Sequence, residues 1–163
     1  MTDFKTADLL DEYYETQPLQ VCQPLFRHFG GKSRFAGKIQ TIRCYDDNSR
    51  VREAVSGAGN SDVLVIDGAG SAKCALLGDM LATKALDNGW SGIVINGYIR
   101  DSVDMSEMSI GVMALGTMPL KSEKHNRGER DVELGFAGGR FTPGHYLYAD
   151  EDGIILSPAA LAY

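Results

Sequence analysis

Apolar residues recur along the chain with two different periods, which distinguish helices from strands. Residues 6–14 carry apolar groups at helical spacing behind Thr6, a candidate cap, and predict an N-terminal helix. Residues 35–45 alternate β-forming and polar side chains and predict a strand, while residues 48–55 suit a short helix. The glycines that follow residue 55 end this helix.

The centre of the chain has the clearest pattern. Residues 63–66 form a short apolar run that predicts a buried strand, ending in the sequence Asp67-Gly68-Ala69-Gly70. A helical stretch from 79 to 88 stops at Gly89, and a second apolar strand covers residues 93–99. These segments are typical of a β-α-β unit with two parallel strands.

The lengths of these segments predict where their ends meet. A helix of about ten residues rises about 15 Å, and a strand of about seven residues returns somewhat over 20 Å. We therefore expect residues 67–70, 78–79 and 100–101 to lie at one edge of the sheet. In open α/β sheets, ligands bind at this carboxyl-end edge.

The remainder of the chain is β-rich. Beyond residue 107, candidate strands alternate with Gly and Pro turns; they span residues 112–115, 132–136, 140–142 and 154–156. No linker or internal repeat divides the sequence. At 163 residues the chain is long enough to bury a substantial core, so we predict one α/β domain over residues 1–163.

Composition excludes several classes of function. The chain is 44% hydrophobic and lacks an apolar run long enough to span a membrane, and its acidic start differs from a secretory signal, so we expect a cytoplasmic protein. Cys22, Cys44 and Cys74 form no C-x-x-C pair and predict reduced, buried thiols. A net charge of −6 without a run of basic residues argues against direct nucleic-acid binding.

The strongest candidate site follows the second central strand. Arg100, Asp101 and Asp104 place a permanent cation beside two carboxylates, a costly group to hold near a core without a ligand. Carboxylates with water are the ligands that Mg²⁺ and Mn²⁺ prefer, and arginine suits a substrate carboxylate or enolate oxygen. On spacing alone, a solvated cluster of ion pairs in a loop explains these residues equally well.

A second element points to the same edge. Gly78-Asp79-Met80-Leu81 opens the central helix, where unpaired backbone N–H groups and the helix dipole favour an anion. The predicted pocket thus has two independent features that suit a small carboxylate.

Other motifs give weaker indications of a function. The stretch from Gly68 to Lys73 lacks both the third glycine of a dinucleotide fingerprint and the ending of a P-loop, which argues against nucleotide binding. His28, His125 and His145 are not spaced as metal ligands, so we expect surface or structural roles. Ser71 and Lys73 lack the context of a hydrolase dyad.

Several short motifs are spread over nearly the whole chain. They are Gln23-Pro24-Leu25-Phe26, Phe29-Gly30-Gly31, Val63-Leu64-Val65-Ile66-Asp67-Gly68, Leu77-Gly78-Asp79, Asn88-Gly89-Trp90, Gly97-Tyr98-Ile99-Arg100-Asp101, Leu147-Tyr148-Ala149-Asp150 and Gly153-Ile154-Ile155. In this order they resemble the RraA-like family, which comprises regulators of ribonuclease E activity A and 4-hydroxy-4-methyl-2-oxoglutarate aldolases. The resemblance implies a swivelling β/β/α type fold and assembly as homotrimers, sometimes paired into hexamers, with the pocket near a subunit boundary.

The resemblance also implies roles for the candidate residues. Asp101 would bind a divalent metal cation (Mg²⁺ or Mn²⁺), with Asp104 and Asp79 orienting its water ligands. Arg100 would contact the carboxylate and keto oxygen of a small 2-oxo acid, and Gly78, Asp79, Met80 and Leu81 would hold substrate through their backbone. Cleavage of 4-hydroxy-4-methyl-2-oxoglutarate and decarboxylation of oxaloacetate both produce a pyruvate enolate, which such a site would stabilise.

Two other functions compete with this hypothesis. A regulator that binds and inhibits ribonuclease E without catalysis is the alternative, and the net charge of −6 is compatible with binding to basic arms of the nuclease. Asp101 after Arg100 favours the enzyme, because a pure interaction protein has no physical need for a metal ligand there. A menaquinone methyltransferase is disfavoured, since no glycine-rich methyl-donor motif follows the first strand.

Overall fold

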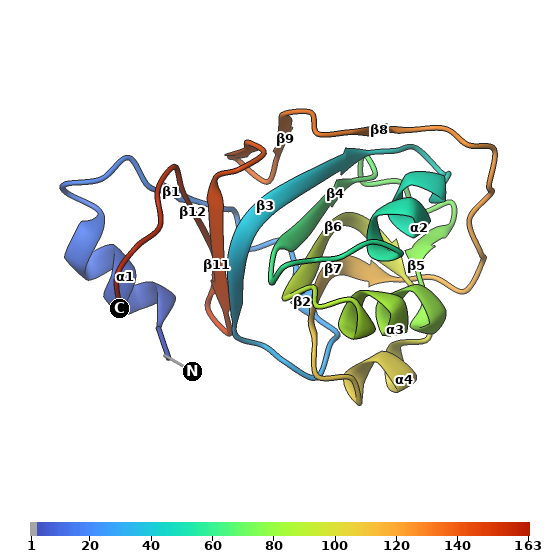
Figure 1. Cartoon of the computed structure of the whole chain (residues 1–163), viewed down its shortest axis with the longest axis horizontal. Helices are drawn as coiled ribbons and strands as arrows, with labels where there is room; N and C mark the ends of the chain where they lie inside the picture. Colours follow the sequence, from blue (N-terminus) through green and yellow to red (C-terminus); the bar gives the residue numbers. More distant parts are fainter. Residues whose placement is uncertain (1–2) are drawn as a thin grey trace.

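A curved mixed sheet forms the body of the protein (Figure 1). The computed structural model describes residues 3–163. The strands are β1 (Gln20–Val21), β2 (Arg27–His28), β3 (Phe35–Arg43), β4 (Val63–Asp67), β5 (Ala75–Leu77), β6 (Gly92–Ile99), β7 (Gly111–Thr117), β8 (Glu129–Arg130), β9 (Leu134–Phe136), β10 (Gly139–Phe141), β11 (Tyr146–Asp150) and β12 (Gly153–Ser157). Ten of these form one sheet of order β1-β12-β11-β3-β4-β6-β7-β2, in which β5 adds to β6 and β8 adds to β3.

The centre of this sheet is parallel and its margins are antiparallel. β3, β4, β6 and β7 run parallel to one another, while β11, β12, β1 and β2 join them as antiparallel neighbours. Strands β9 and β10 pair separately as a small antiparallel hairpin. The mixed α/β class and the β-rich C-terminal half are confirmed.

Residues 3–163 form four helices, which lie on two sides of the sheet. They are α1 (Thr6–Tyr13), α2 (Ser49–Val55), α3 (Asp79–Asp87) and α4 (Ser102–Ser106). Figure 1 shows α2, α3 and α4 together on one side of the parallel strands, whereas α1 lies at the far end beside β11 and β12. The first three helices match the predicted ones, and α4 was not predicted.

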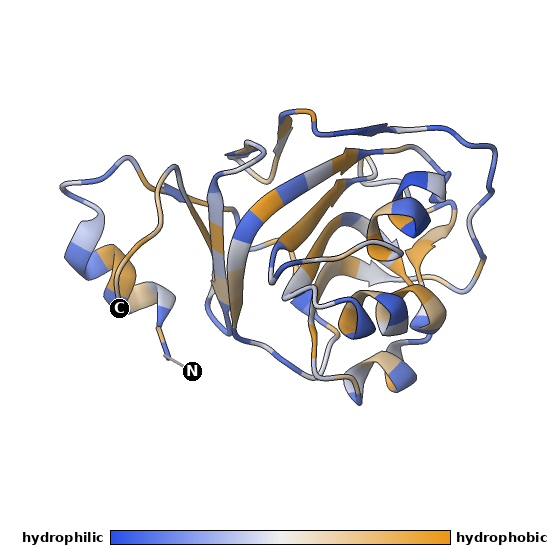
Figure 2. Ribbon diagram, viewed as in Figure 1, coloured by the Kyte–Doolittle hydropathy of each residue, from blue (hydrophilic) through white to orange (hydrophobic). Residues whose placement is uncertain are grey.

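Strands β4, β6 and β7 are buried on both faces over most of their length, so alternate residues enter two different cores. Leu64 and Ile66 of β4 pack under the helices, whereas Val63 and Val65 point into the concave side with Phe141. Figure 2 shows the resulting apolar colour along most of β4. This pattern is typical of parallel strands covered on both faces and explains why residues 63–66 are a run rather than an alternation.

Phe35 connects strands that are distant in the sequence. Its ring is 2% exposed and lies directly over Gly92 and Gly111, at the first positions of β6 and β7. A Cβ atom at either glycine would overlap the ring. The absence of side chains at these two positions therefore lets a large aromatic residue close one end of the concave core.

The structure corrects several predicted boundaries. The strand expected over 132–136 begins at Leu134, because the carbonyl oxygen of Val132 instead accepts a hydrogen bond from the Thr41 hydroxyl. The strand expected over 140–142 is β10, one residue earlier. The single predicted crossover also contains the extra strand β5, which extends the sheet beside the second half of β6.

The N-terminal helix is capped differently from the prediction. Thr6 is the first residue of α1 rather than its cap, and Lys5 precedes it without a side-chain cap. The Thr6 backbone N–H and hydroxyl both donate to the buried Asp150 carboxylate of β11, at 2.7 and 2.8 Å. A strand carboxylate thus replaces the local cap and attaches α1 to the sheet.

The three cysteines are free and buried, as predicted. Burial raises the pKa of the Cys22 and Cys44 thiols to about 12. Within residues 3–163 no helix has the length and apolarity needed to cross a membrane.

Candidate functional site

A cavity of about 270 Å³ opens where the carboxyl ends of β5 and β6 meet α2 and α3. Its lining comes from four separate parts of the chain: Asn48, Arg52, Ala75, Gly78, Asp79, Met80, Leu81, Lys84, Arg100, Asp101, Lys121, Ser122 and Lys124. Arg100, Asp101 and the other four predicted substrate-binding residues, 78 to 81, are therefore brought together. A second, more open hollow is also lined by Arg100 and Asp101 and reaches Pro119.

Asp101 is turned toward the start of α3 by an uncommon backbone conformation. Its φ of 58° and ψ of 40° lie in the left-handed region, which costs a non-glycine residue free energy but which aspartate tolerates better than most. Its carboxylate oxygen Oδ2 accepts a hydrogen bond from the Asp79 backbone N–H at 3.0 Å. Backbone strain at a cavity, used to aim one carboxylate, is typical of functional sites.

Gly78 makes this close approach feasible. A Cβ atom at position 78 would lie 2.8 Å from Asp101 Oδ2 and 3.4 Å from Arg100 Nε. Arg100 is held at the same place by its backbone N–H, which donates to the Leu77 carbonyl oxygen at 2.9 Å. The side chains of Arg100 and Asp101 are partly exposed and 3.9 Å apart, so their ion pair leaves the guanidinium largely available to a ligand.

Asp79 and Asp101 form a pair of carboxyl groups. A side-chain hydrogen bond with Asp101 raises the pKa of Asp79, and burial and the nearby charges of Asp101 and Asp104 raise it further. Two carboxyl groups this close repel each other when both are ionised, and either a shared proton or a bound cation relieves the repulsion.

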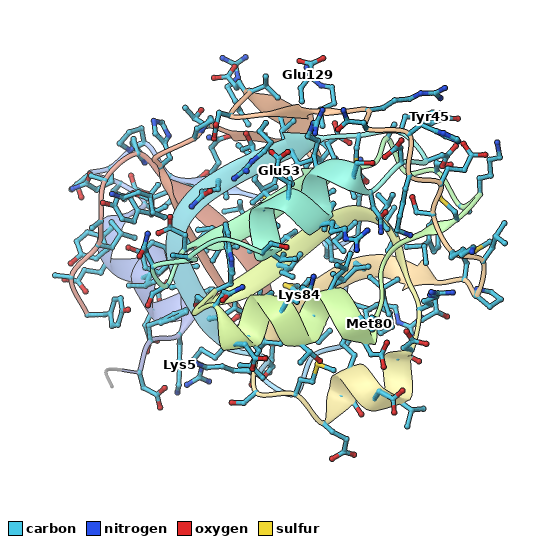
Figure 3. The ribbon with its side chains drawn as sticks, turned by 45° about the vertical axis from the view of Figure 1, so that its right-hand side comes forward. Lys5, Tyr45, Glu53, Met80, Lys84 and Glu129 are labelled. Atoms are coloured by element: carbon cyan, nitrogen blue, oxygen red, sulfur yellow. The ribbon has the colours of Figure 1, made fainter. Side chains whose placement is uncertain are left out.

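The other predicted residues lie further out. Asp104 is exposed on α4 and is not part of the cavity lining, although its charge affects Asp79. Met80 is 75% exposed at the first turn of α3, with Lys84 one turn further along the same helix (Figure 3). Residues 67–70 do not line the cavity, because the unpredicted β5 carries the chain further along β6 before α3 begins.

Four cations of the cavity were not identified from the sequence. Arg52 comes from α2, Lys84 from α3, and Lys121 and Lys124 from the loop of residues 118–128 between β7 and β8, here called the crossing loop. They are scattered over more than seventy residues, so no basic run marks them. The i, i+4 spacing of Met80 and Lys84 is the one local signal that could have placed Lys84 beside the site.

The crossing loop is fastened to the start of α2. The buried Asp47 carboxylate accepts hydrogen bonds from the Ser49 N–H and hydroxyl and from the His125 backbone N–H, at 2.9, 2.6 and 2.6 Å. Burial opposes ionisation of Asp47, but these hydrogen bonds outweigh it and lower its pKa. Arg50 adds hydrogen bonds to the carbonyl oxygens of Asn126 and Gly128. The loop that carries Lys121 and Lys124 is therefore held in place.

The acidic side of the cavity fits a hydrated divalent cation. No three His, Cys, Asp or Glu side chains among residues 3–163 are gathered in a way that would hold a metal ion without other ligands. Mg²⁺, however, commonly uses one or two carboxylates and keeps several waters. Asp101, with its neighbour Asp79 hydrogen-bonded to it, supplies such a donor set.

Fold and cavity together define a class: an α/β protein with paired carboxylates and a partly exposed arginine at the carboxyl ends of parallel strands. The chain belongs to the RraA-like family, whose Aldolase/RraA model matches residues 6–156. A protein of Laribacter hongkongensis, provisionally named 4-hydroxy-4-methyl-2-oxoglutarate aldolase, is 53% identical over 159 residues, which are 98% of this chain and 99% of that protein.

Solved structures of this family share the fold closely. One, described as S-adenosylmethionine:2-dimethylmenaquinone methyltransferase from Geobacillus kaustophilus, has a TM-score of 0.94 at 48% identity, covering 97% of each chain. Another, described as the RNA-processing inhibitor RraA from Thermus thermophilis, has a TM-score of 0.94 at 40% identity, covering 99% of this chain and 96% of that one. The predicted RraA-like fold is confirmed.

Proposed function

We propose that this protein is a divalent-metal-dependent pyruvate aldolase that cleaves 4-hydroxy-4-methyl-2-oxoglutarate, with oxaloacetate decarboxylation as a side activity. The observation that carries the proposal is the Asp101 carboxylate, strained into place beside Arg100 and the start of α3. Relatives that share about half of their residues with this chain carry the aldolase name, which supports the same reaction class.

The chain's own groups suit a 2-oxo acid. The Arg100 guanidinium binds the carboxylate and keto oxygen of the pyruvyl portion, as its planar donor fork favours. Asp79 donates its backbone N–H to Asp101, and its carboxyl group accepts a hydrogen bond from the Met80 N–H, so the Leu81 N–H remains for the substrate. Both sets of donors stabilise negative charge that develops on the keto oxygen.

Asp101 would hold the divalent cation, and Asp104 and Asp79 would orient water around it. When bound, the cation would supply Lewis acidity at the keto oxygen. A base, either a water whose pKa is lowered or a water held by an acid, takes the 4-hydroxyl proton. C4 becomes a carbonyl carbon as the C3–C4 bond breaks, and the electron pair of that bond forms a pyruvate enolate. Protonation of the enolate at C3 gives pyruvate, and the fragment that contains C4 is a second pyruvate. Oxaloacetate reaches the same enolate by loss of CO₂, so one arrangement of Arg100 and the Leu81 N–H serves both reactions.

The charge of the cavity supports this function over methyl transfer to a quinone. Arg52, Lys84, Arg100, Lys121 and Lys124 line it, and such a lining favours a small anion over an apolar ring system. The names of the Geobacillus and Thermus relatives are statements about those two proteins alone.

The test is pyruvate release from both substrates with Mg²⁺ or Mn²⁺, measured against an EDTA control. We expect metal-dependent turnover that Asp101→Ala abolishes, while Asp87→Ala, an exposed acid at the end of α3, retains it. Arg100→Ala should lose most turnover, about 10²–10³-fold for one such donor, but keep most of its affinity for Mn²⁺. Full activity of the Asp101→Ala protein would refute the site.

Absence of turnover in the wild-type protein would favour the alternative, a regulator that binds ribonuclease E, in line with the RNA-processing inhibitor of Thermus. Direct binding of the purified protein to ribonuclease E would then be the measurement to make.

Homotrimer or hexamer assembly forms part of the same proposal. Met80 and Val103 are 75% and 77% exposed, and Leu120 is 56% exposed at the start of the crossing loop. Large apolar side chains left in water near a cavity support an interface there. Light scattering of the protein measures the state directly, and a monomer at micromolar concentration would contradict it.

A further inference from the structure

We propose that the cavity contains a second anion subsite, formed by Arg52, Lys84, Lys121 and Lys124, that binds the distal carboxylate of a dicarboxylic 2-oxo acid. The inference rests on the proposed function, in which Arg100 and the start of α3 take the pyruvyl end. It assigns substrate selection to residues that lie apart from the paired carboxylates.

The four cations are unpaired in a region where other cations have partners. In the part of the chain described by the structure, none of the four makes an ion pair. Their neighbour Glu53 is engaged by Arg50 and Arg130, at 3.1 and 3.2 Å. Four like charges around one cavity repel one another, and a bound anion relieves this repulsion.

A buried hydrogen-bond acceptor without a partner indicates which group the ligand carries between its own two carboxylates. Asn48 is 6% exposed and lines the cavity, and its amide nitrogen donates to the Leu76 carbonyl oxygen at 3.1 Å. This contact fixes the orientation of the amide, because a carbonyl oxygen accepts only from the NH₂ side. The Asn48 oxygen Oδ1 has no hydrogen-bond partner among the described residues.

An unpaired buried acceptor is costly, so a ligand that donates to it gains affinity. A hydroxyl group on the substrate is such a donor. The cavity therefore suits a compact molecule with a carboxylate at each end and a hydroxyl group between them.

The size of the cavity places both ends in one molecule. At about 270 Å³ it holds one small ligand rather than two independent ones. Residues 78–81, 100 and 101 line part of this cavity, and the four cations line it from α2, the second turn of α3 and the crossing loop.

Asp47 is a positioning residue for this subsite. It fastens the crossing loop through His125, and Asn48 continues the attachment by donating its backbone N–H to the Ser122 hydroxyl at 2.9 Å. Lys121 and Lys124 are thus presented from an ordered loop, which lowers the entropic cost of binding an anion.

The first experiment measures binding, which does not depend on turnover. Calorimetry with Mg²⁺ present compares 2-oxoglutarate with 2-oxopentanoate, in which a methyl group replaces the distal carboxylate. We expect the wild-type protein to bind 2-oxoglutarate about 10–100-fold more tightly, as charge-assisted hydrogen bonds provide. The Lys121→Met/Lys124→Met protein should bring this ratio close to one.

Lys73→Met is the matched control, because Lys73 is an exposed lysine outside the cavity. It should leave the wild-type ratio unchanged. Equal affinity of the wild-type protein for both acids, or an unchanged ratio in the double variant, would overturn the subsite.

A kinetic comparison separates this inference from the proposed function. The ratio of kcat/KM for 4-hydroxy-4-methyl-2-oxoglutarate to that for 4-hydroxy-2-oxopentanoate should fall in the double variant, mainly through a higher KM for the dicarboxylate. Preferential binding of 2-oxoglutarate without any turnover would support the subsite and contradict the proposed aldolase function. Turnover of both substrates with equal kcat/KM in the wild-type protein would keep the aldolase and reject the subsite.

Discussion

Replacing Gly111 by alanine would put a methyl group against the buried ring of Phe35. The backbone at Gly111 has no positive φ, so alanine fits the strand itself and would reduce the entropy of the unfolded chain, a gain of about 0.4–1 kcal/mol. The sign of the overall effect therefore depends on whether the ring can move.

The structure indicates that it cannot. The new Cβ would overlap the Cδ1 side of the ring, and a Cβ at Gly92 would overlap the Cδ2 side, so the backbone of both strands confines the ring from below. Overpacking of a close-packed core costs about 1–3 kcal/mol, which exceeds the entropic gain. We expect a net loss of about 1–2 kcal/mol, or a melting temperature lower by about 2–8 °C for a chain of this size.

Urea denaturation at one fixed protein concentration measures this loss as a shift in midpoint without a change in slope. A double-mutant cycle with Phe35→Leu identifies its cause, because a smaller side chain makes room for the methyl group. The two changes together should cost less than the sum of the single changes. A Gly111→Ala protein as stable as the wild type, or strict additivity with Phe35→Leu, would refute the packing argument.

Three further predictions concern other regions. The lowered pKa of Asp47 means that its ionised form stabilises the native state above the ordinary carboxyl pKa, and this stability is lost as the pH falls below about 4; Asp47→Asn should flatten that part of a stability–pH curve. Asp150→Ala should cost roughly 2–4 kcal/mol and speed hydrogen exchange in α1, since Thr6 loses both of its acceptors. Cys22 and Cys44, with pKa values raised to about 12, should resist iodoacetamide at pH 8 until urea unfolds the protein, and rapid alkylation of the native protein would contradict their burial.

Local patterns were enough for the long elements of the fold. The central strands and α3 have strong periodicity and clear ends, so their positions could be predicted within a few residues. Strands such as β1, β2 and β8 are two residues long and exist because a distant partner pairs with them. Their existence depends on contacts such as Arg27 with Ala114, which no local pattern records.

The residues that line the cavity likewise fall into those placed by local patterns and those placed by tertiary contacts. Arg100 and Asp101 directly follow a buried strand, and Gly78 directly precedes a helix, so their meeting could be predicted from segment lengths. Lys121 and Asn48 meet them through the crossing loop and the hydrogen bonds of Asp47, which are tertiary contacts between residues more than seventy positions apart. The strained φ of Asp101 was also not predictable, since aspartate is common in ordinary backbone conformations.

The place where α1 docks has a consequence for synthesis of the protein. The surface on which α1 docks consists of β11 and β12, near the other end of the chain. Leu9 of α1 shares a small apolar cluster there with Tyr148 and Leu161. At about 5–20 residues per second, the first helix leaves the ribosome on the order of ten seconds before its docking surface does. During that interval its apolar face is available to chaperones and proteases, and a stalled chain that lacks the last strands would expose it permanently.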